Sequence, residues 1–235
     1  MKRFYQTASI APGESGHEIV LDGRPVRTPA RALLTVPGAA LAEAIAGEWN
    51  GQGDEIDPGA MPMTGLANAT IDRVLPALGE FRGQVAAYGA SDLFCYRADH
   101  PDALATLQKA HWDAMLNWTA ARYGVDFVVT SGIMPADQPA RTLAALRGAV
   151  EATDPWLLAG MMKLVSIGGS LVGALAYLEG AASADDLWTA VSLDERFQLD
   201  HWGSDEEAEA HLAATRSEFM NAARYCALVR QDTES

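Results

Sequence analysis

The five histidines are the side chains in this sequence best suited to bind a transition metal or to transfer protons. His201 and His211 lie in an acidic region, but they are ten residues apart and do not share a helical turn. His111 stands beside Trp112 and Asp113. A metal site assembled from distant segments stays open, but we interpret these histidines as surface or helix-capping residues and predict no metal.

The sequence lacks the local signatures by which many enzymes bind phosphate or activate a nucleophile. It contains no Walker A sequence, no GxGxxG between a strand and a helix, no HExxH, no GxSxG and no complete EF-hand loop. The segment 54–59 faintly resembles a calcium loop but has no closing glutamate at the required distance. We therefore predict a protein that is not an enzyme and needs no cofactor. The alternative is an enzyme or ligand-binding protein with a pocket between two domains, and a third reading is a structural subunit of an oligomer.

One short stretch, 193–203, combines negative charge with aromatic side chains that could anchor a partner. On a helix, residues three apart share a face, so Asp194 would lie near Phe197, and Glu195 near Gln198. Structural roles compete, namely a helix cap for Asp194 and a core position for Phe197, which we favour for that residue. Glu195 stands between two charged neighbours and is expected to be exposed. The predicted partner-binding residues are Asp194, Glu195, Phe197, Gln198 and Trp202.

The composition describes a globular protein with a strongly acidic surface. Its 235 residues are 49% hydrophobic and 20% charged, and 17 basic against 31 acidic residues give a net charge of −14. Residues 183–235 carry 4 basic and 12 acidic groups, more than half of the excess. Such a chain is repelled by phosphate backbones and anionic lipids, so nucleic acids and membrane surfaces are poor partners. Small molecules, cations and proteins with basic or apolar faces are better ones.

Cysteine usage and the absence of long apolar runs predict a cytoplasmic protein. Cys95 and Cys226 each lie among apolar residues, which favours two reduced thiols over a disulfide. The N-terminal residues 1–10 show neither an apolar signal segment nor an Arg- and Ser-rich presequence. The longest uncharged stretch, 164–178, is too short and too rich in glycine to span a bilayer comfortably.

The first third of the chain has the pattern of a small β-rich domain. Residues 17–21 and 24–28 flank Asp22-Gly23, which predicts a hairpin with a type I′ turn. A further extended segment is expected at 32–36. Apolar residues at 41, 45 and 49 then predict a short helix. We take the Gly-, Pro- and Asp-rich segment 51–62 as the crossover, which gives a small α/β domain at 1–60 and a helical domain at 61–235.

The second part has the pattern of a helical domain. Thr64 is expected to cap a helix toward residue 74, and Pro76 to open the next one. A long helix from about 101 to 123 should point Leu104, Leu107, Trp112, Met115 and Trp118 inward. Residues 126–131 could form a short strand, and 139–151 a helix. Capping signals at 183–186 and 204–207 predict the last two helices.

One apolar helix is predicted to start at Asp154-Pro155 and to contain Gly168, Gly169 and Gly173. Glycine inside a helix costs about 1 kcal/mol relative to alanine, so it needs a compensating reason. No lysine or Ser/Thr follows at the spacing of a phosphate-binding loop. We therefore interpret these glycines as sites where another helix approaches closely.

Four stretches give the chain a family resemblance. They read LDGRPVRTP at 21–29, MPMTGLANATID at 61–72, DLFCYRA at 92–98 and LDERFQ at 193–198, the last followed by Trp202-Gly203. In this order and spacing, they resemble the assembly chaperones that hold the alpha subunit of ATP synthase in mitochondria and alphaproteobacteria. The likeness extends over nearly the whole chain.

The resemblance implies an α+β fold, with a small β-rich α/β domain followed by a larger all-helical one. It also implies a non-catalytic role, in which the protein binds free alpha subunit before that subunit joins beta. The expected partner is thus the ATP synthase alpha subunit, with no nucleic acid, no membrane insertion and no self-association beyond the monomer. The lack of a presequence points to a bacterial, cytoplasmic member, or to a mature form from which the presequence has been removed.

Overall fold

The structure is a computed structural model that describes residues 1–132, 134, 136–203 and 206–231, apart from the side chain of Trp202. It confirms the predicted α+β class, with a small strand-containing region followed by a larger helical part. Contacts group the chain into two compact units whose bounds differ from the predicted division at residue 60. Unit 1 contains residues 1–78, 154–160 and the chain from 221 onward, and unit 2 contains 79–153 and 161–220.

Unit 1 is built on a four-stranded sheet in which β2 (Gly16–Leu21) is the central strand. It pairs antiparallel with β1 (Ala8–Gly13), β3 (Arg24–Pro25) and β4 (Thr35–Val36). Positive φ angles at Asp22 (48°) and Gly23 (78°) match the type I′ turn that the sequence predicts, so the hairpin is confirmed. Strand β1 was not predicted, because its residues are mostly small and show little of the alternation between apolar and polar side chains that marks a strand.

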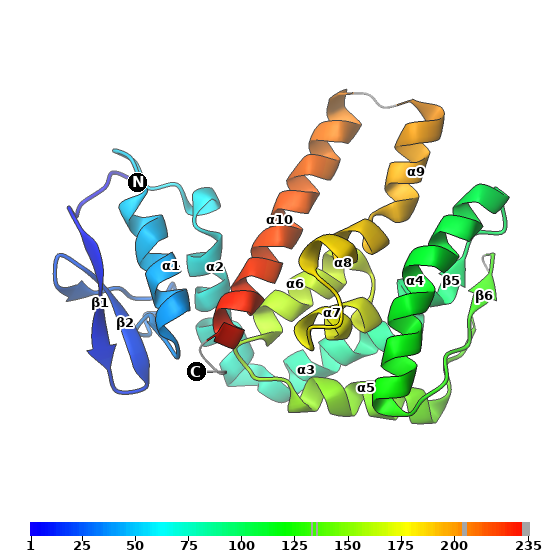
Figure 1. The fold of residues 1–235 in the computed structure, drawn as a ribbon. Helices are drawn as coiled ribbons and strands as arrows, with labels where there is room; N and C mark the ends of the chain where they lie inside the picture. The colour runs from blue at the N-terminus through cyan, green and yellow to red at the C-terminus, as the bar shows by residue number, and fades with distance from the viewer. Residues whose placement is uncertain (133, 135, 204–205, 232–235) are drawn as a thin grey trace. The chain divides into compact units, whose positions relative to one another are not determined.

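Helix α1 (Ala39–Asn50) packs against the sheet, as Figure 1 shows, and confirms the predicted short helix. Leu41 and Ile45 of its apolar stripe are fully buried. The helix also protects the edge strand, because the Asn50 side chain bonds both backbone groups of Ala8 at 2.8 Å. Further along this edge Pro12 has no N–H to offer. These two features block much of the edge against pairing with another strand.

A carboxylate from α1 holds the start of α2 (Pro62–Ala69). Glu48 accepts hydrogen bonds from the backbone N–H groups of Met63 (2.6 Å) and Thr64 (2.8 Å), and from the Thr64 hydroxyl (2.7 Å). The prediction that Thr64 caps this helix was wrong, because Pro62 already occupies the first turn and Thr64 lies inside it. An acidic group at a helix N-terminus satisfies free N–H groups and is favoured by the helix dipole.

Residues from late in the chain complete the core of unit 1. The end of α10 (Glu206–Gln231) contributes Tyr225 and Cys226, both fully buried. The Tyr225 hydroxyl hydrogen-bonds the Thr70 hydroxyl at 3.0 Å, across 155 residues of sequence. Gly160 lies so close to Cys226 Sγ that a side chain there would collide with it. This small unit therefore depends on both ends of the chain.

Unit 2 surrounds helix α7 (Leu171–Leu178), every residue of which is buried. Helices α4 (Asp102–Tyr123) and α8 (Ala184–Val191) pack against it (Figure 1). Trp112 of α4 is fully buried, donates its indole N–H to the Ala190 carbonyl (2.8 Å) and stacks on Phe94 with ring centroids 5.4 Å apart. The unit also includes α3 (Leu78–Ala87), β5 (Tyr96–Arg97), β6 (Thr130–Ser131), α5 (Ala140–Ala152), most of α6 (Leu158–Gly168), α9 (Leu193–Trp202), and α10 up to residue 220.

The apolar helix predicted from Asp154 onward is two helices, so that prediction was wrong. Gly169 has a φ of +66°, which ends α6 because a left-handed residue cannot continue a right-handed helix. Ser170 then caps α7 by accepting from the Gly173 N–H at 2.9 Å. Close packing is confirmed at Gly173, where a side chain would meet Leu187, and at Gly168, which lies against Val191.

The remaining local predictions were confirmed only in part. The predicted cap at 183–186 is confirmed, because Ser183 and Asp186 bond each other reciprocally as a capping box at the start of α8. Of the strand expected at 126–131, only Thr130–Ser131 forms, pairing parallel with β5. The capping prediction at 204–207 falls partly on residues outside those described. No helix in the described part of the chain has the length and apolarity needed to cross a membrane.

Candidate functional site

The predicted partner-binding stretch forms α9, and its residues have three different environments. Asp194 is half-buried, and its Oδ1 accepts a hydrogen bond from Gln108 Nε2 at 2.7 Å. Phe197 is also half-buried and stacks on His201, with ring centroids 3.9 Å apart and planes inclined by 21°. Glu195 and Gln198 are exposed. The structure thus gives Asp194 a structural contact and leaves Glu195 open to solvent, as predicted.

Phe197 lines a shallow groove between α9 and α4. The groove has a volume of about 110 Å³, and its walls include Leu107, Leu193, Arg196 and Asp200. Leu107 was predicted to point inward, but it is 42% exposed. That prediction was wrong because α9 covers only part of this face of α4. The groove therefore presents apolar surface together with one cationic and one anionic side chain.

A second hollow continues from this groove along α4. It has a volume of about 300 Å³ and shares His111 and Thr189 with the first. Its walls are mostly apolar, with Asp186 at the start of α8 as the acidic member. The residues of α4 that line the two hollows form one stripe at helical spacing. The stripe consists of Leu107, Ala110, His111, Ala114, Met115 and Trp118. We call this surface, from Leu107 to Trp118 with the facing residues of α8 and α9, the α4 groove.

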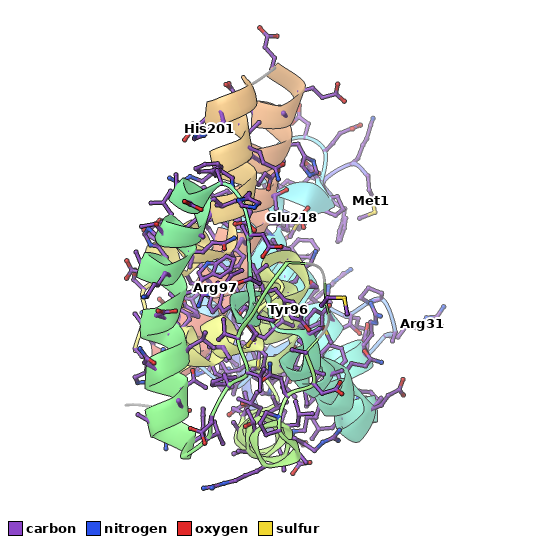
Figure 2. The ribbon with its side chains drawn as sticks, turned by 90° about the vertical axis from the view of Figure 1, so that its right-hand side faces the viewer. Met1, Arg31, Tyr96, Arg97, His201 and Glu218 are labelled. Carbon is purple, nitrogen blue, oxygen red and sulfur yellow. The ribbon has the colours of Figure 1, made fainter. Side chains whose placement is uncertain are left out.

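Glu195 and Gln198 lie on the other side of α9. At about 100° per residue, Glu195 is turned about 160° away from both Leu193 and Phe197, which line the α4 groove, and Gln198 is turned about 140° and 100° away from them. The predicted set is therefore not one patch but two faces of one helix, plus the inward contact of Asp194. The side chain of Trp202 lies outside what the structure describes. Figure 2 marks His201, the exposed histidine near the end of this helix.

The α4 groove was not predicted from the sequence. The signal was present in the stripe Leu107, Ala114 and Trp118, but a stripe of this kind more often faces a core. Within the described residues, no three His, Cys, Asp or Glu side chains come together as a metal site would require. Both cysteines are free and buried, and burial raises the pKa of each thiol to about 12, which makes Cys95 and Cys226 poor nucleophiles.

The carboxylate with the most unusual environment, Asp92, has a structural role. It is fully buried, and burial raises its pKa to about 6 against the opposing effect of its hydrogen bonds. Its oxygens accept from the Ser170 hydroxyl (2.8 Å), the Val172 N–H (2.8 Å) and the Phe94 N–H (3.1 Å). Asp92 lines none of the described hollows, so it joins the segment before β5 to the start of α7 rather than facing a substrate.

The four stretches that carry the family resemblance are connected in pairs by single polar side chains. In unit 1, the Thr28 hydroxyl donates to Asp72 Oδ1 at 2.6 Å, which links the first stretch to the second. In unit 2, Gln108 accepts from the Ala98 N–H at 2.8 Å while it donates to Asp194, which links the third stretch to the fourth. These members of the four stretches therefore stabilise the fold.

Comparison with known proteins identifies the family. The model of the family described as "ATP12 chaperone protein" matches residues 2–120. The chain belongs to the ATP12 chaperone family. A curated member, "Protein atp12, mitochondrial" from Schizosaccharomyces pombe, is 22% identical over 224 residues, which cover 88% of this chain and 75% of that protein.

Solved structures of ATP12 relatives extend the likeness to nearly the whole fold. Atp12 from Paracoccus denitrificans is 37% identical, with a TM-score of 0.92 over 97% of this chain and 98% of that one. The Atu1473 protein from Agrobacterium tumefaciens is 35% identical, with a TM-score of 0.89 over 96% of this chain and 84% of that one. The ATP12 fold thus includes both compact units and the α4 groove region.

Proposed function

We propose that this protein is a non-catalytic assembly chaperone that binds the free alpha subunit of ATP synthase and shields its interface until beta replaces it. The observation that carries the proposal is membership of the ATP12 chaperone family, with 37% identity to a solved Atp12 over 97% of the chain. The protein works as a monomer in the bacterial cytoplasm and needs no nucleotide, metal or other cofactor for this role.

The physical need for such a protein follows from the client. Subunits of permanent assemblies carry large apolar interfaces, of about 2,000 Å² or more. Before assembly these surfaces are exposed and drive aggregation. A chaperone has to cover them with an affinity below that of the final neighbour, so that the neighbour can displace it. The net charge of −14 would help to keep such a complex in solution.

The α4 groove and the outer face of α9 form the proposed docking surface. The groove offers Leu107 and Phe197 to an apolar side chain of the client, and Asp186 and Asp200 to a neighbouring basic one. Glu195 and Gln198 extend the contact on the other side of the helix. Asp194 supports this surface through its bond to Gln108, and Trp202 belongs to the proposal by its position at the end of α9.

Suppression of aggregation tests the function itself. Isolated alpha subunit and isolated beta subunit are each diluted from denaturant in the presence of this protein, and light scattering is followed. We expect stoichiometric protection of alpha and far less protection of beta. Equal protection of both would indicate a general holding chaperone, and no protection of alpha would refute the proposal.

Two matched leucines test the docking surface. Leu107 in the α4 groove and Leu75 in unit 1 are 42% and 41% exposed, so replacing either by glutamate changes a similar surface. Substitutions at exposed sites typically change stability by about 0.5 kcal/mol or less. We expect Leu107→Glu to weaken capture of the alpha subunit about tenfold or more, and Leu75→Glu to leave it unchanged. Equal capture by both variants would exclude the α4 groove as the docking site.

A further inference from the structure

Unit 1 has a cavity of its own, which the function proposed above does not use. Its volume is about 690 Å³, within the range of sites that hold small ligands or several side chains. It is formed by the first residues of the chain, the end of β2, β3 and its continuation, and α1. Its walls include Tyr5, Leu21, Arg24, Val26, Arg27 and Trp49. We call it the β3 cavity.

The inner wall of the β3 cavity is apolar and rigid. Tyr5, Leu21 and Val26 are buried as residues. The Tyr5 hydroxyl donates to the Trp49 carbonyl at 2.6 Å, and the two rings meet edge to face with centroids 5.6 Å apart. Phe4 also lines the cavity and is 66% exposed, one of the most exposed large apolar side chains in the described chain. Such a wall is suited to an apolar or aromatic side chain of a ligand.

The cavity carries positive charge in a strongly acidic protein. Arg24 and Arg27 are both exposed where they line it. Arg27 donates one N–H to the Arg31 carbonyl at 2.8 Å, and Arg24 forms no ion pair with any described residue. Arg31, next to this region in the chain, extends away from the ribbon in Figure 2. The cavity therefore offers guanidinium groups that can still bind an anion.

The acidic residue at the cavity does not neutralise these arginines fully. Asp22 accepts hydrogen bonds from the backbone N–H of Thr7 at 2.9 Å and of Gln6 at 3.0 Å. These bonds, together with the weaker effect of the Arg24 and Arg3 charges, hold the pKa of Asp22 below its usual value, and they fix its carboxylate against the segment before β1. The indole N–H of Trp49, another residue that lines the cavity, is enclosed and has no acceptor within the described part of the chain. The site therefore has an excess of donors.

We propose that the β3 cavity binds a polypeptide segment that presents a carboxylate next to an apolar side chain. The carboxylate would lie between Arg24 and Arg27, and the apolar side chain against Phe4 and Tyr5. A polypeptide is the occupant that fits a chaperone family, because the exposed apolar side chain of Phe4 lines the same cavity as two cations, and the sequence has no phosphate-binding loop. The inference builds on the proposed function, since the client would supply this segment. It adds a second contact with the client. The β3 cavity would bind an acidic group of the client, whereas the α4 groove would bind a basic one.

Two blocked peptides test the charge preference on the full-length protein. The probes are acetyl-Asp-Leu-Phe-Asp-Leu-amide and its counterpart with lysine in place of aspartate. Binding is read from the ¹H–¹⁵N spectrum, in which the Trp49 indole signal is assigned by its loss in Trp49→Phe. We expect the acidic peptide to shift this signal saturably and the basic peptide to leave it in place. Equal shifts by both peptides, or none by either at millimolar concentration, would overturn the proposal.

Charge reversal with a matched control locates the site. Arg24→Glu/Arg27→Glu and Arg73→Glu/Arg224→Glu change the net charge equally, and all four arginines are exposed residues of unit 1. We expect about tenfold or more weaker peptide binding in the first variant and unchanged binding in the second. If the double variant does not fold, the single variant Arg24→Glu provides the same test, because the Arg24 side chain forms no hydrogen bond with the described residues. An equal loss in the control pair would reject the β3 cavity as the site.

Two further measurements separate this inference from the proposed function. If wild-type protein captures the alpha subunit and Arg24→Glu/Arg27→Glu captures it equally well, the second contact is refuted while the chaperone function stands. If wild-type protein fails to capture the alpha subunit, the proposed function fails, and the peptide titration still decides the chemistry of the cavity. Saturation of the Trp49 signal by ATP at a concentration far below that of the peptide would assign the cavity to a nucleotide and overturn the proposal.

Discussion

Asp92 and Glu195 are acidic residues from two of the stretches that resemble the ATP12 family, yet their surroundings are opposite. Asp92 is fully buried and accepts three hydrogen bonds that join distant parts of unit 2. Glu195 is exposed on the outer face of α9. The difference shows that a stretch of sequence typical of the family does not act as one functional site. Its buried members set the shape of the molecule, and its exposed members are free to meet a partner.

The largest effect is expected when the buried carboxylate is removed. Asp92→Ala would leave the N–H groups of Phe94 and Val172 and the Ser170 hydroxyl without their acceptor, so we expect a loss of about 3 kcal/mol or more in the free energy of unfolding. Denaturant unfolding measures it. The control Asp137→Ala removes an exposed carboxylate and should cost little. A loss below about 1 kcal/mol in Asp92→Ala would show that water or other groups replace the contacts.

A somewhat smaller effect is expected from the titration of Asp92. Its pKa is raised from 3.8 to about 6 by burial, so between these values the folded protein keeps a proton that the unfolded chain releases. The contribution of Asp92 to stability is therefore complete below about pH 4 and falls as the pH rises through 6, by up to about 3 kcal/mol.

The pH effect is isolated by comparison with Asp92→Asn, which cannot titrate. The free energy of unfolding of both proteins is measured from pH 4 to pH 7. We expect the difference between wild type and variant to change over this window, because the other carboxylates are common to both. Parallel curves would contradict a raised pKa at Asp92.

The smallest effect on stability is expected at the exposed carboxylate. Glu195→Lys should change the free energy of unfolding by well under about 1 kcal/mol, as exposed charge pairs do. It should nevertheless weaken capture of the alpha subunit if Glu195 meets a basic group there. Glu209→Lys is the matched control, since both residues are exposed acids in the first turn of their helices. A thermal melt and a pull-down of the alpha subunit measure both properties.

The two outcomes at Glu195 have different meanings. Unchanged melting together with unchanged capture would remove Glu195 from the docking surface and leave the α4 groove as its remaining part. A large drop in melting temperature would instead place Glu195 with Asp92, among the residues that stabilise the fold, and the contrast between the two stretches would disappear.

The features predicted correctly from the sequence are those determined by neighbours in the chain. The Asp22-Gly23 turn and the Ser183 capping box each depend on residues within a few positions. The break at Gly169 was missed because glycine is compatible both with close packing and with a left-handed helix end, and only the surrounding structure selects one. Local sequence left that choice undetermined.

The candidate site was predicted less well than the fold. The prediction placed it on α9 and correctly expected Glu195 to be exposed. The bond from Gln108 to Asp194 spans 86 residues, and no local pattern indicates it. Leu107 was assigned to the core because helical periodicity shows which residues share a face but not whether another element covers that face. Exposure is a property of the assembled fold.

The contribution of the last helix to unit 1 has a consequence for the order in which the protein forms on the ribosome. Thr70 is translated 155 residues before its partner Tyr225. At roughly 5–20 residues per second, this interval lasts roughly eight to thirty seconds. Throughout it, unit 1 lacks the side chains of Tyr225 and Cys226, which are fully buried in the finished unit. A chaperone of this architecture therefore spends its own synthesis with an incomplete N-terminal core, exposed to the same hazard from which it would protect its client.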